Sequence, residues 1–238
     1  YPGLWLRDDV YALHGHYLDL HNRVPTIERL AAGAMARFVA PIPVRGATPE
    51  DYESVLAPLY AWMFALAQRS RSGVARAGSR SSVRAWMALT GEGRRERPVR
   101  ALALNAGLRG AVLGLNRAGI GPLRAELSGA ALRRGSLAGM SDVLTRLGVD
   151  APYVLFGHTH RAGPWERDDP SEWRTPAGTR LFNSGSWVYQ RHFLSDRSGA
   201  GPYWPGVAIR VDASGPPVLE RLLADRTHDE LSPPEARA

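Results

Sequence analysis

The chain has 238 residues, of which 44% are hydrophobic, enough to form a buried core in one large domain or two small ones. Its 30 basic residues are all arginine and outnumber 23 acidic residues, giving a formal net charge of +7. Because cysteine is absent, a disulfide framework, a thiolate zinc site and a cysteine nucleophile are excluded. The longest apolar run, from Val55 to Ala67, is too short to cross a bilayer.

The predicted elements fall into three zones along the chain. The first is a short hairpin, in which the apolar runs 4–6 and 10–13 flank a polar turn. The middle zone, residues 24–148, has Ala, Leu and Arg at helical spacing and therefore predicts helices. Five are expected, over 26–38, 49–68, 81–89, 98–116 and 135–147. The third zone returns to strands, expected at 153–156, at 180–182 and in a hairpin of 206–211 with 218–223.

The basic excess is confined to one segment of the helical zone. Residues 69–100 contain nine arginines and two glutamates, so this segment accounts for the whole net charge. Within it, residues 69–82 are rich in Arg, Ser and Gly and predict a mobile loop. We expect a solvated face here, with a docking strip for anionic lipid or an acidic substrate as the alternative. Nucleic acid is not the expected partner.

Five of the seven histidines lie in two clusters, each after an apolar strand pattern. His14, His16 and His21 form the first cluster, and His158 and His160 form the second. Side chains at the carboxyl ends of sheet strands project into the crevice where α/β proteins bind ligands. Imidazole suits zinc, iron, manganese and nickel. The clusters therefore indicate one shared metal centre, with hydrogen-bonded structural histidines as the alternative.

Three segments carry a family resemblance. The segment 156–161 (FGHTHR) resembles the GHxH signature of calcineurin-like metallophosphoesterases. The segment 14–19 (HGHYLD) is similar to the motif with that family's isolated histidine ligand, and 183–187 (NSGSW) is similar to the strand end after GHxH. The motifs occur in family order and cover about residues 1–21 and 150–223.

The resemblance implies an α/β fold: the C-terminal part of a metallophosphoesterase β-sandwich flanked by helices, with a mainly α-helical inserted cap. Residues 1–23 and 149–226 would form the core portion, 24–148 the helical insertion, and 227–238 a flexible tail. The implied protein is a hydrolase of cytoplasmic location, with peripheral membrane contact through residues 49–100 as an alternative.

The implied activity is metal-dependent hydrolysis of a phosphate ester or pyrophosphate by a metal-bridging hydroxide. Carried over by position, His14 and His158 hold one of two divalent ions (Mn, Fe or Zn) and His160 holds the other. His16 is expected to contact phosphate or act as an acid, and Arg161 to contact phosphate. Two further residues, Asp19 and Asn183, are expected to support the ligands from behind. The substrate is phosphorylated, with a lipid-linked phosphate as one option.

The other ligand motifs of the family, DxH, GD and GNH[DE], do not occur here in their expected places. Asp19-Leu20-His21 spells DxH, but it follows the His14 motif and is interpreted as coincidence. Since three neutral imidazoles lack the anionic ligands that a divalent pair needs, we expect the remaining ligands upstream of Tyr1 and no activity from this chain alone. The alternative function is a non-catalytic module that binds anionic lipid or nucleic acid through the Arg-rich segment.

Overall fold

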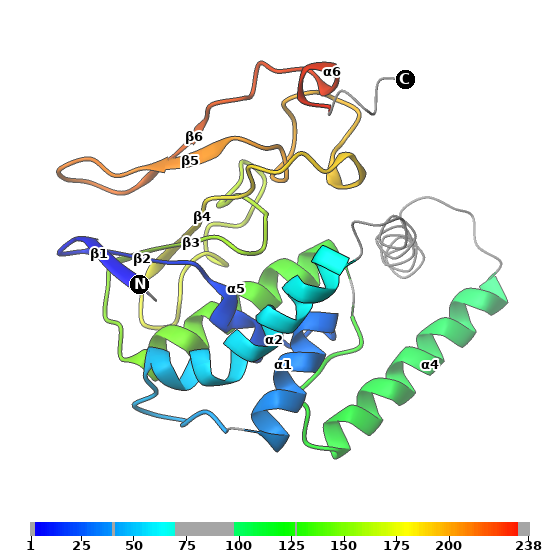
Figure 1. Ribbon diagram of the computed structural model, residues 1–238. Coiled ribbons are helices and arrows are strands. Elements are labelled where there is room, and N and C mark those ends of the chain that lie inside the picture. The colour runs from blue at the N-terminus through cyan, green and yellow to red at the C-terminus, as the bar shows by residue number, and fades with distance from the viewer. Residues whose placement is uncertain (1–2, 40, 70–97, 127, 233–238) are drawn as a thin grey trace. The chain divides into compact units, whose positions relative to one another are not determined.

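The computed structural model describes residues 3–39, 41–69, 98–126 and 128–232 (Figure 1). It is a mixed α/β structure that divides into two compact units. The first unit comprises Tyr1–His16 and Val149–Ala238, and the second comprises Tyr17–Gly148. The predicted helix 81–89 and nearly all of the predicted loop 69–82 lie outside the described residues.

A mixed sheet of four strands forms the centre of the first unit. The order is β1 (Gly3–Arg7), β2 (Val10–Leu13), β3 (Tyr153–Phe156) and β4 (Arg180–Asn183). The first pair is antiparallel, as the predicted hairpin requires, whereas β2, β3 and β4 run parallel. Val10, Leu155 and Phe182 pack together as a buried cluster across these three parallel strands. The apolar runs of β2, β3 and β4 thus supply the buried residues of the sheet, whereas Leu4, Trp5 and Leu6 of β1 are exposed.

The first unit also contains the predicted second hairpin, formed by β5 (Val207–Arg210) and β6 (Val218–Arg221). After it, residues 227–232 begin the segment that the sequence predicts to be a flexible tail. A short helix, α6 (His228–Leu231), begins there because Thr227 and Glu230 form a reciprocal capping box. The His228 ring lies 5.0 Å from the Trp204 ring and its Nδ1 lies 2.9 Å from the Tyr189 hydroxyl.

The second unit is helical, as predicted. It contains most of the short 3₁₀ helix η1 (His16–Leu20), then α1 (Ile27–Phe38), α2 (Pro49–Arg69), α4 (Pro98–Arg117) and α5 (Gly129–Leu147). Helix α5 begins at Gly129 rather than at Gly135, because the Ser128 side chain accepts a hydrogen bond from the Ala131 amide and caps the helix.

The boundary between the units lies earlier than the sequence predicts, at His16 rather than at Arg23. Packing explains the difference: the ring of Tyr17 stacks on Tyr52 of α2 at 4.5 Å and is almost wholly buried. The Tyr17 hydroxyl also donates to Glu53, at 2.8 Å. Residues 17–23 therefore belong to the helical unit rather than to the strand unit.

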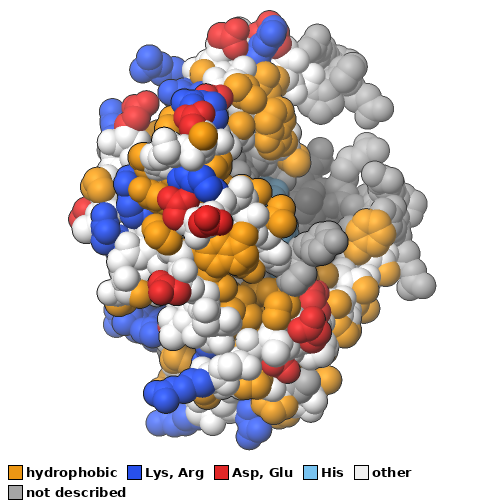
Figure 2. All heavy atoms as spheres, turned by 90° about the vertical axis from the view of Figure 1, so that its left-hand side faces the viewer, with side chains coloured by type: hydrophobic (Ala, Val, Ile, Leu, Met, Phe, Trp, Pro, Cys, Tyr) orange, Lys and Arg blue, Asp and Glu red, His pale blue; other side chains and the backbone are white. Residues whose placement is uncertain are grey.

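Helix α2 is apolar on most sides but only partly covered within the described residues. Val55 and Leu56 are fully buried, whereas Trp62 and Phe64 are 62% and 65% exposed. None of the helices in the described part of the chain is both long enough and apolar enough to cross a membrane. On the face drawn in Figure 2, arginine and acidic side chains are interspersed.

Candidate functional site

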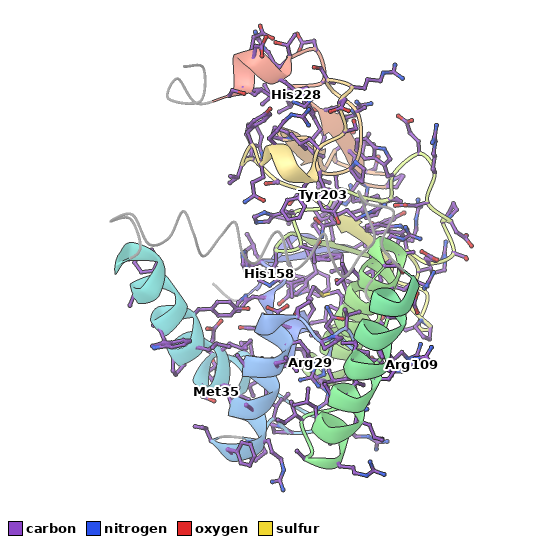
Figure 3. The ribbon with its side chains drawn as sticks, turned by 90° about the vertical axis from the view of Figure 1, so that its right-hand side faces the viewer. Arg29, Met35, Arg109, His158, Tyr203 and His228 are labelled. Atoms are coloured by element: carbon purple, nitrogen blue, oxygen red, sulfur yellow. The ribbon has the colours of Figure 1, made fainter. Side chains whose placement is uncertain are left out.

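The parallel pairing of β2 with β3 brings the two histidine motifs together. Ala12 pairs with Leu155, so both strands reach the same sheet edge just before His14 and His158. The ring centroids of His14 and His158 are 5.3 Å apart, and those of His16 and His158 are 6.4 Å apart. Figure 3 marks His158 at this strand end. Three imidazoles from distant parts of the sequence therefore converge, as the strand pattern predicts.

Within the first motif, His14 and His16 face each other. Their Nδ1 atoms are 3.0 Å apart and their ring centroids 5.1 Å apart. At this distance one ring can donate a hydrogen bond to the other, and the tautomers of the two rings decide which one is the donor.

Backbone contacts hold the motifs against each other. The Gly157 amide donates to the His14 carbonyl at 3.0 Å. Gly15 has a φ of 109°, and a Cβ there would lie 3.2 Å from the Gly157 carbonyl oxygen and 3.4 Å from the His158 Cβ. Glycine is needed at this position because the backbone is left-handed and the second motif approaches closely.

The second motif has an unusual backbone. His158 and His160 have φ angles of 70° and 58°, a left-handed region that costs a non-glycine residue about 1 kcal/mol or more. The surrounding hydrogen bonds must supply that energy. Such outliers concentrate at functional sites, so this observation supports a role for the loop beyond packing.

Asn183, at the end of β4, braces this loop. It is 1% exposed, and its Nδ2 donates to the Gly157 carbonyl at 3.1 Å and to the Thr159 hydroxyl at 2.9 Å. Its Oδ1 accepts from the Gly185 amide at 2.9 Å. Asn183 therefore supports the loop that carries His158 through these hydrogen bonds.

His160 stands apart from the other three rings. In the part of the chain that the structure describes, it makes no ring contact with His14, His16 or His158. Partial desolvation and, second, the charge of His158 lower the pKa of His160 below its ordinary value. Its imidazole is therefore biased towards the neutral form, the form that ligates metals.

Arg161, which is expected to contact phosphate, forms an ion pair with Asp168. Its two terminal nitrogens donate to both carboxylate oxygens of Asp168, at 2.9 and 2.6 Å. The side chains are 12% and 4% exposed, and the guanidinium lies over the ring of Trp173. To reach a phosphate, Arg161 would have to break this bidentate pair.

Asp19, which the sequence suggests as a support for the histidine ligands, belongs to a different compact unit from His14, His158 and His160. It lies in the helical unit, where its buried carboxylate accepts from the Tyr60 hydroxyl at 2.5 Å. In the same unit, His21 Nε2 is 2.8 Å from the Tyr52 hydroxyl. The Asp19-Leu20-His21 sequence therefore contributes to the packing of η1 on α2.

The chemistry of the donors decides how far these residues fit a metal. Imidazole nitrogens suit transition metals, but a divalent pair on phosphate also needs anionic ligands. Among the described residues, no group of three or more His, Asp or Glu has the geometry to hold an ion. The described side chains therefore do not complete a metal site.

Comparisons with protein-family models, with curated proteins and with solved structures find no match to this chain. One group of residues was missed by sequence reasoning: arginines that line a cavity of the helical unit. A signal for it exists, since Arg29, Gly33 and Arg37 follow one another at four-residue spacing and so share one face of α1.

Proposed function

We propose that this chain contributes the imidazole ligands of a metal-dependent phosphoesterase that resembles the calcineurin-like metallophosphoesterases. The observation that carries the proposal is the contact of His14 and His16 with His158, at centroid distances of 5.3 and 6.4 Å. The three rings come from the motifs that carry the resemblance, and they meet at the carboxyl ends of parallel strands, where α/β proteins bind ligands.

In this proposal His14 and His158 are ligands of one ion and His160 is a ligand of the other. A bound divalent pair would supply an activated water and neutralise charge on the phosphoryl oxygens. The anionic ligands would come from residues upstream of Tyr1, since the described imidazoles do not complete a site. The core would then be a metallophosphoesterase sandwich, with the helical unit as its cap.

The remaining residues of this chain have positioning roles. Asn183 and the Gly157 amide fix the loop that carries His158, and both are held by hydrogen bonds of 2.9 to 3.1 Å. With Arg161 bound to Asp168, the phosphate contact falls to His16, whose Nδ1 lies next to that of His14. His16 therefore acts on substrate in this proposal, either as a hydrogen-bond donor or as the acid.

The test uses the full-length gene product loaded with Mn²⁺. His14→Ala and His158→Ala should each lower hydrolysis of an aryl phosphate monoester or diester by about 100-fold or more, and should reduce bound metal measured by equilibrium dialysis. His228→Gln, which changes a histidine of the same unit outside the cluster, is the matched control. Unchanged hydrolysis and unchanged metal content in both alanine variants would refute the proposal.

A second candidate function, binding to anionic membranes, is favoured by one observation on α2. Trp62 and Phe64 are exposed among the described residues, and the helix leads into the Arg-rich segment. Apolar side chains next to basic ones suit an interfacial site. Binding to phosphatidylserine vesicles that weakens with salt and with Trp62→Ser would support it, and a lipid-linked phosphate would then be the substrate to test.

A further inference from the structure

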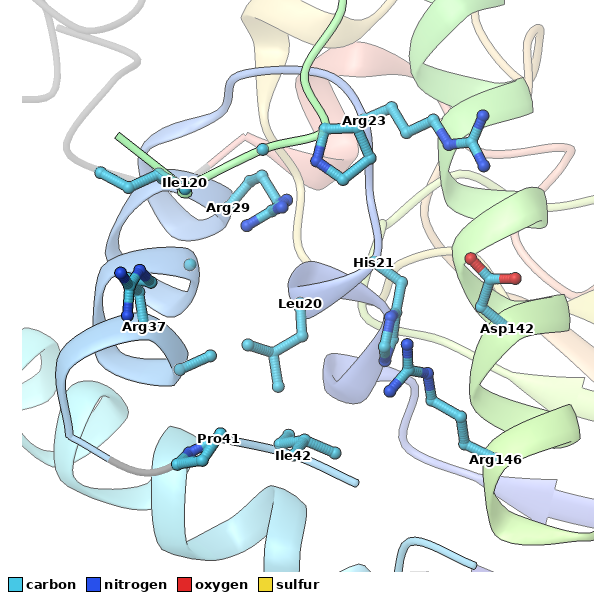
Figure 4. Close-up of a pocket in the computed structure, with 15 residues that line it drawn as sticks. Leu20, His21, Arg23, Arg29, Arg37, Pro41, Ile42, Ile120, Asp142 and Arg146 are labelled. Carbon is cyan, nitrogen blue, oxygen red and sulfur yellow. The ribbon is translucent and has the colours of Figure 1, made fainter. Parts of the chain in front are cut away.

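A cavity of about 380 Å³ lies within the helical unit. It is bounded by η1, α1, the segment 119–122 and α5. In Figure 4, Arg29 and Arg37 come from the α1 side, His21 and Arg146 from the opposite side, and Leu20 lies between them. Every residue that lines it belongs to the same compact unit, so the cavity is a property of that unit alone.

The charged residues that line the cavity are mostly cations. Four arginines contribute to its wall, and Asp142 is the one acidic residue among the lining residues that the structure describes: Arg23, Arg29, Arg37 and Arg146. Within the described residues none of these arginines forms an ion pair, and Arg146 is bonded through its Nη1 to the Pro43 carbonyl at 2.8 Å. The wall therefore carries a positive charge that the described side chains do not neutralise.

Arg29 is the central residue of this wall. It is 4% exposed, and its Nε donates to the Asn22 carbonyl at 2.6 Å, which fixes the side chain. Among the described residues, its Nη1 and Nη2 atoms make no hydrogen bond. Since every fully enclosed side-chain nitrogen or oxygen in the described residues has a partner, the small opening left to these atoms is towards the cavity.

Moving a charged guanidinium out of water raises the free energy of the folded state unless another group compensates the charge. Burial lowers the pKa of Arg29, and the more distant charge of Asp19 opposes the shift only in part. Gly33 provides the space for the side chain, because a Cβ there would lie 2.3 Å from Arg29 Nη1. A nearly buried guanidinium with two free donor atoms facing a cavity is the arrangement expected where an anion completes the site.

His21, which also lines the cavity, is neutral. Burial, together with the charges of Arg146 and Arg29, lowers the pKa of His21 to about 3, and burial raises the pKa of Tyr52. The His21–Tyr52 pair is therefore uncharged near neutral pH. It adds no negative charge to oppose an anion, and the charges of Arg146 and Arg29 add to the effect of burial on the pKa of His21.

Size and lining indicate what kind of anion fits. The volume lies within the range of roughly 300–1,000 Å³ seen for organic ligands and is far larger than a phosphate ion needs. Leu20, Ile42 and Ile120 give part of the wall an apolar surface. Because several guanidinium groups suit a dianion better than a single carboxylate, we propose that this cavity binds a small organic phosphate monoester through Arg29, with Arg37 and Arg146 around it.

The site is independent of the proposed metal chemistry. Binding should therefore persist in EDTA, which removes bound metal, and in the His14→Ala variant, which removes one imidazole of the histidine cluster. The two proposals can therefore fail separately, because a variant that loses hydrolysis at the histidine cluster can still bind an anion in the cavity.

The experiment measures binding of phenyl phosphate to the whole chain by calorimetry in EDTA. Arg29→Met should weaken binding at least about 10-fold, the equivalent of one lost charge-assisted hydrogen bond. Because Arg29→Met changes a buried residue, Arg37→Ser on the exposed side of the wall provides a second variant, with an expected loss of about 3-fold or more. Arg109→Ala, on α4 and outside the cavity wall (Figure 3), is the matched control and should bind like the wild type.

Two further readouts make the outcome decisive. Phenyl phosphate should raise the pKa of His21, followed by NMR titration, because an anion offsets the charges of Arg29 and Arg146. Benzoate and inorganic phosphate should each bind more weakly than phenyl phosphate. Absence of saturable binding, equal binding by both cavity variants and wild type, or equal affinity for benzoate would overturn the proposal.

Discussion

His21 makes the stability of the helical unit depend on pH, and replacing it tests the electrostatics of that unit directly. Its pKa is lowered to about 3 in the folded chain, first by burial and then by the charges of Arg146 and Arg29. In the unfolded chain the ordinary value of 6.5 applies. Between these values the unfolded state binds the proton and the folded state does not, so stability is present above about pH 6.5 and is lost as the pH falls towards 3.

The size of the effect follows from the two pKa values. A gap of about 3.5 pKa units corresponds to a limiting loss of about 5 kcal/mol below pH 3. At about pH 5 only part of that loss is reached, about 2 kcal/mol relative to about pH 8. A loss of that size is large against the usual net stability of roughly 5–15 kcal/mol for a folded protein.

The assay compares urea unfolding at about pH 5 and about pH 8 for the wild type and His21→Gln. Glutamine keeps an amide near the position of Nε2, and so can still bond to the Tyr52 hydroxyl, but it does not titrate. The variant should therefore lose about 2 kcal/mol less than the wild type on going to the lower pH. Equal pH dependence in the two proteins would refute the assignment, and His228→Gln controls for the loss of a histidine elsewhere.

Three predictions concern the histidine loops and the ion pair beside them. Asn183→Leu removes three buried hydrogen bonds and should lower the free energy of unfolding by about 3 kcal/mol in urea titrations; a loss below about 0.5 kcal/mol would contradict its bracing role. Gly15→Ala should lower the midpoint of thermal unfolding more than Gly178→Ala, because both glycines have positive φ but only a Cβ at Gly15 would contact other residues. Equal losses would show that the close approach of the second motif to Gly15 does not matter for stability. Arg161→Lys should cost about 1–3 kcal/mol in the same urea titration, because lysine cannot make the bidentate pair with Asp168, and a neutral result would show that this pair does not stabilise the fold.

Much of the fold follows from the sequence because its elements have strong local signals. The apolar runs that became β2, β3 and β4 are short and bounded by Gly, Pro or polar residues, so their type is clear from the residues alone. Helices α1 and α2 were predicted nearly to their ends, since Thr26 and Pro49 start them. The start of α5 was missed because Ser128 lies in a Gly- and Ala-rich stretch with little helical amphipathicity.

The sequence predicts that the histidine motifs meet at the end of the strands, but it does not predict that His21 belongs to the helical unit. His14, His16 and His21 stand within eight residues of one another, and the sequence treats them as one cluster. In the structure, the 3₁₀ turn after His16 turns the chain into the helical unit, where His21 pairs with Tyr52. That separation depends on the stacking of Tyr17 on a helix some 35 residues away, which no local pattern of η1 encodes.

A count of charged residues along the sequence does not show where the folded chain gathers its charge. Counting residues assigns the whole net charge to segment 69–100 and leaves the rest of the chain neutral. The cavity nevertheless gathers arginines from positions 23, 29, 37 and 146, which are spread over neutral stretches of sequence, around a single aspartate. Folding brings arginines of α1 and α5 to one cavity. Burial excludes water from Arg29, and the lower effective dielectric constant strengthens the attraction of its charge for an anion. The residue to test for anion binding is therefore a nearly buried arginine on a short helix rather than the longest basic run.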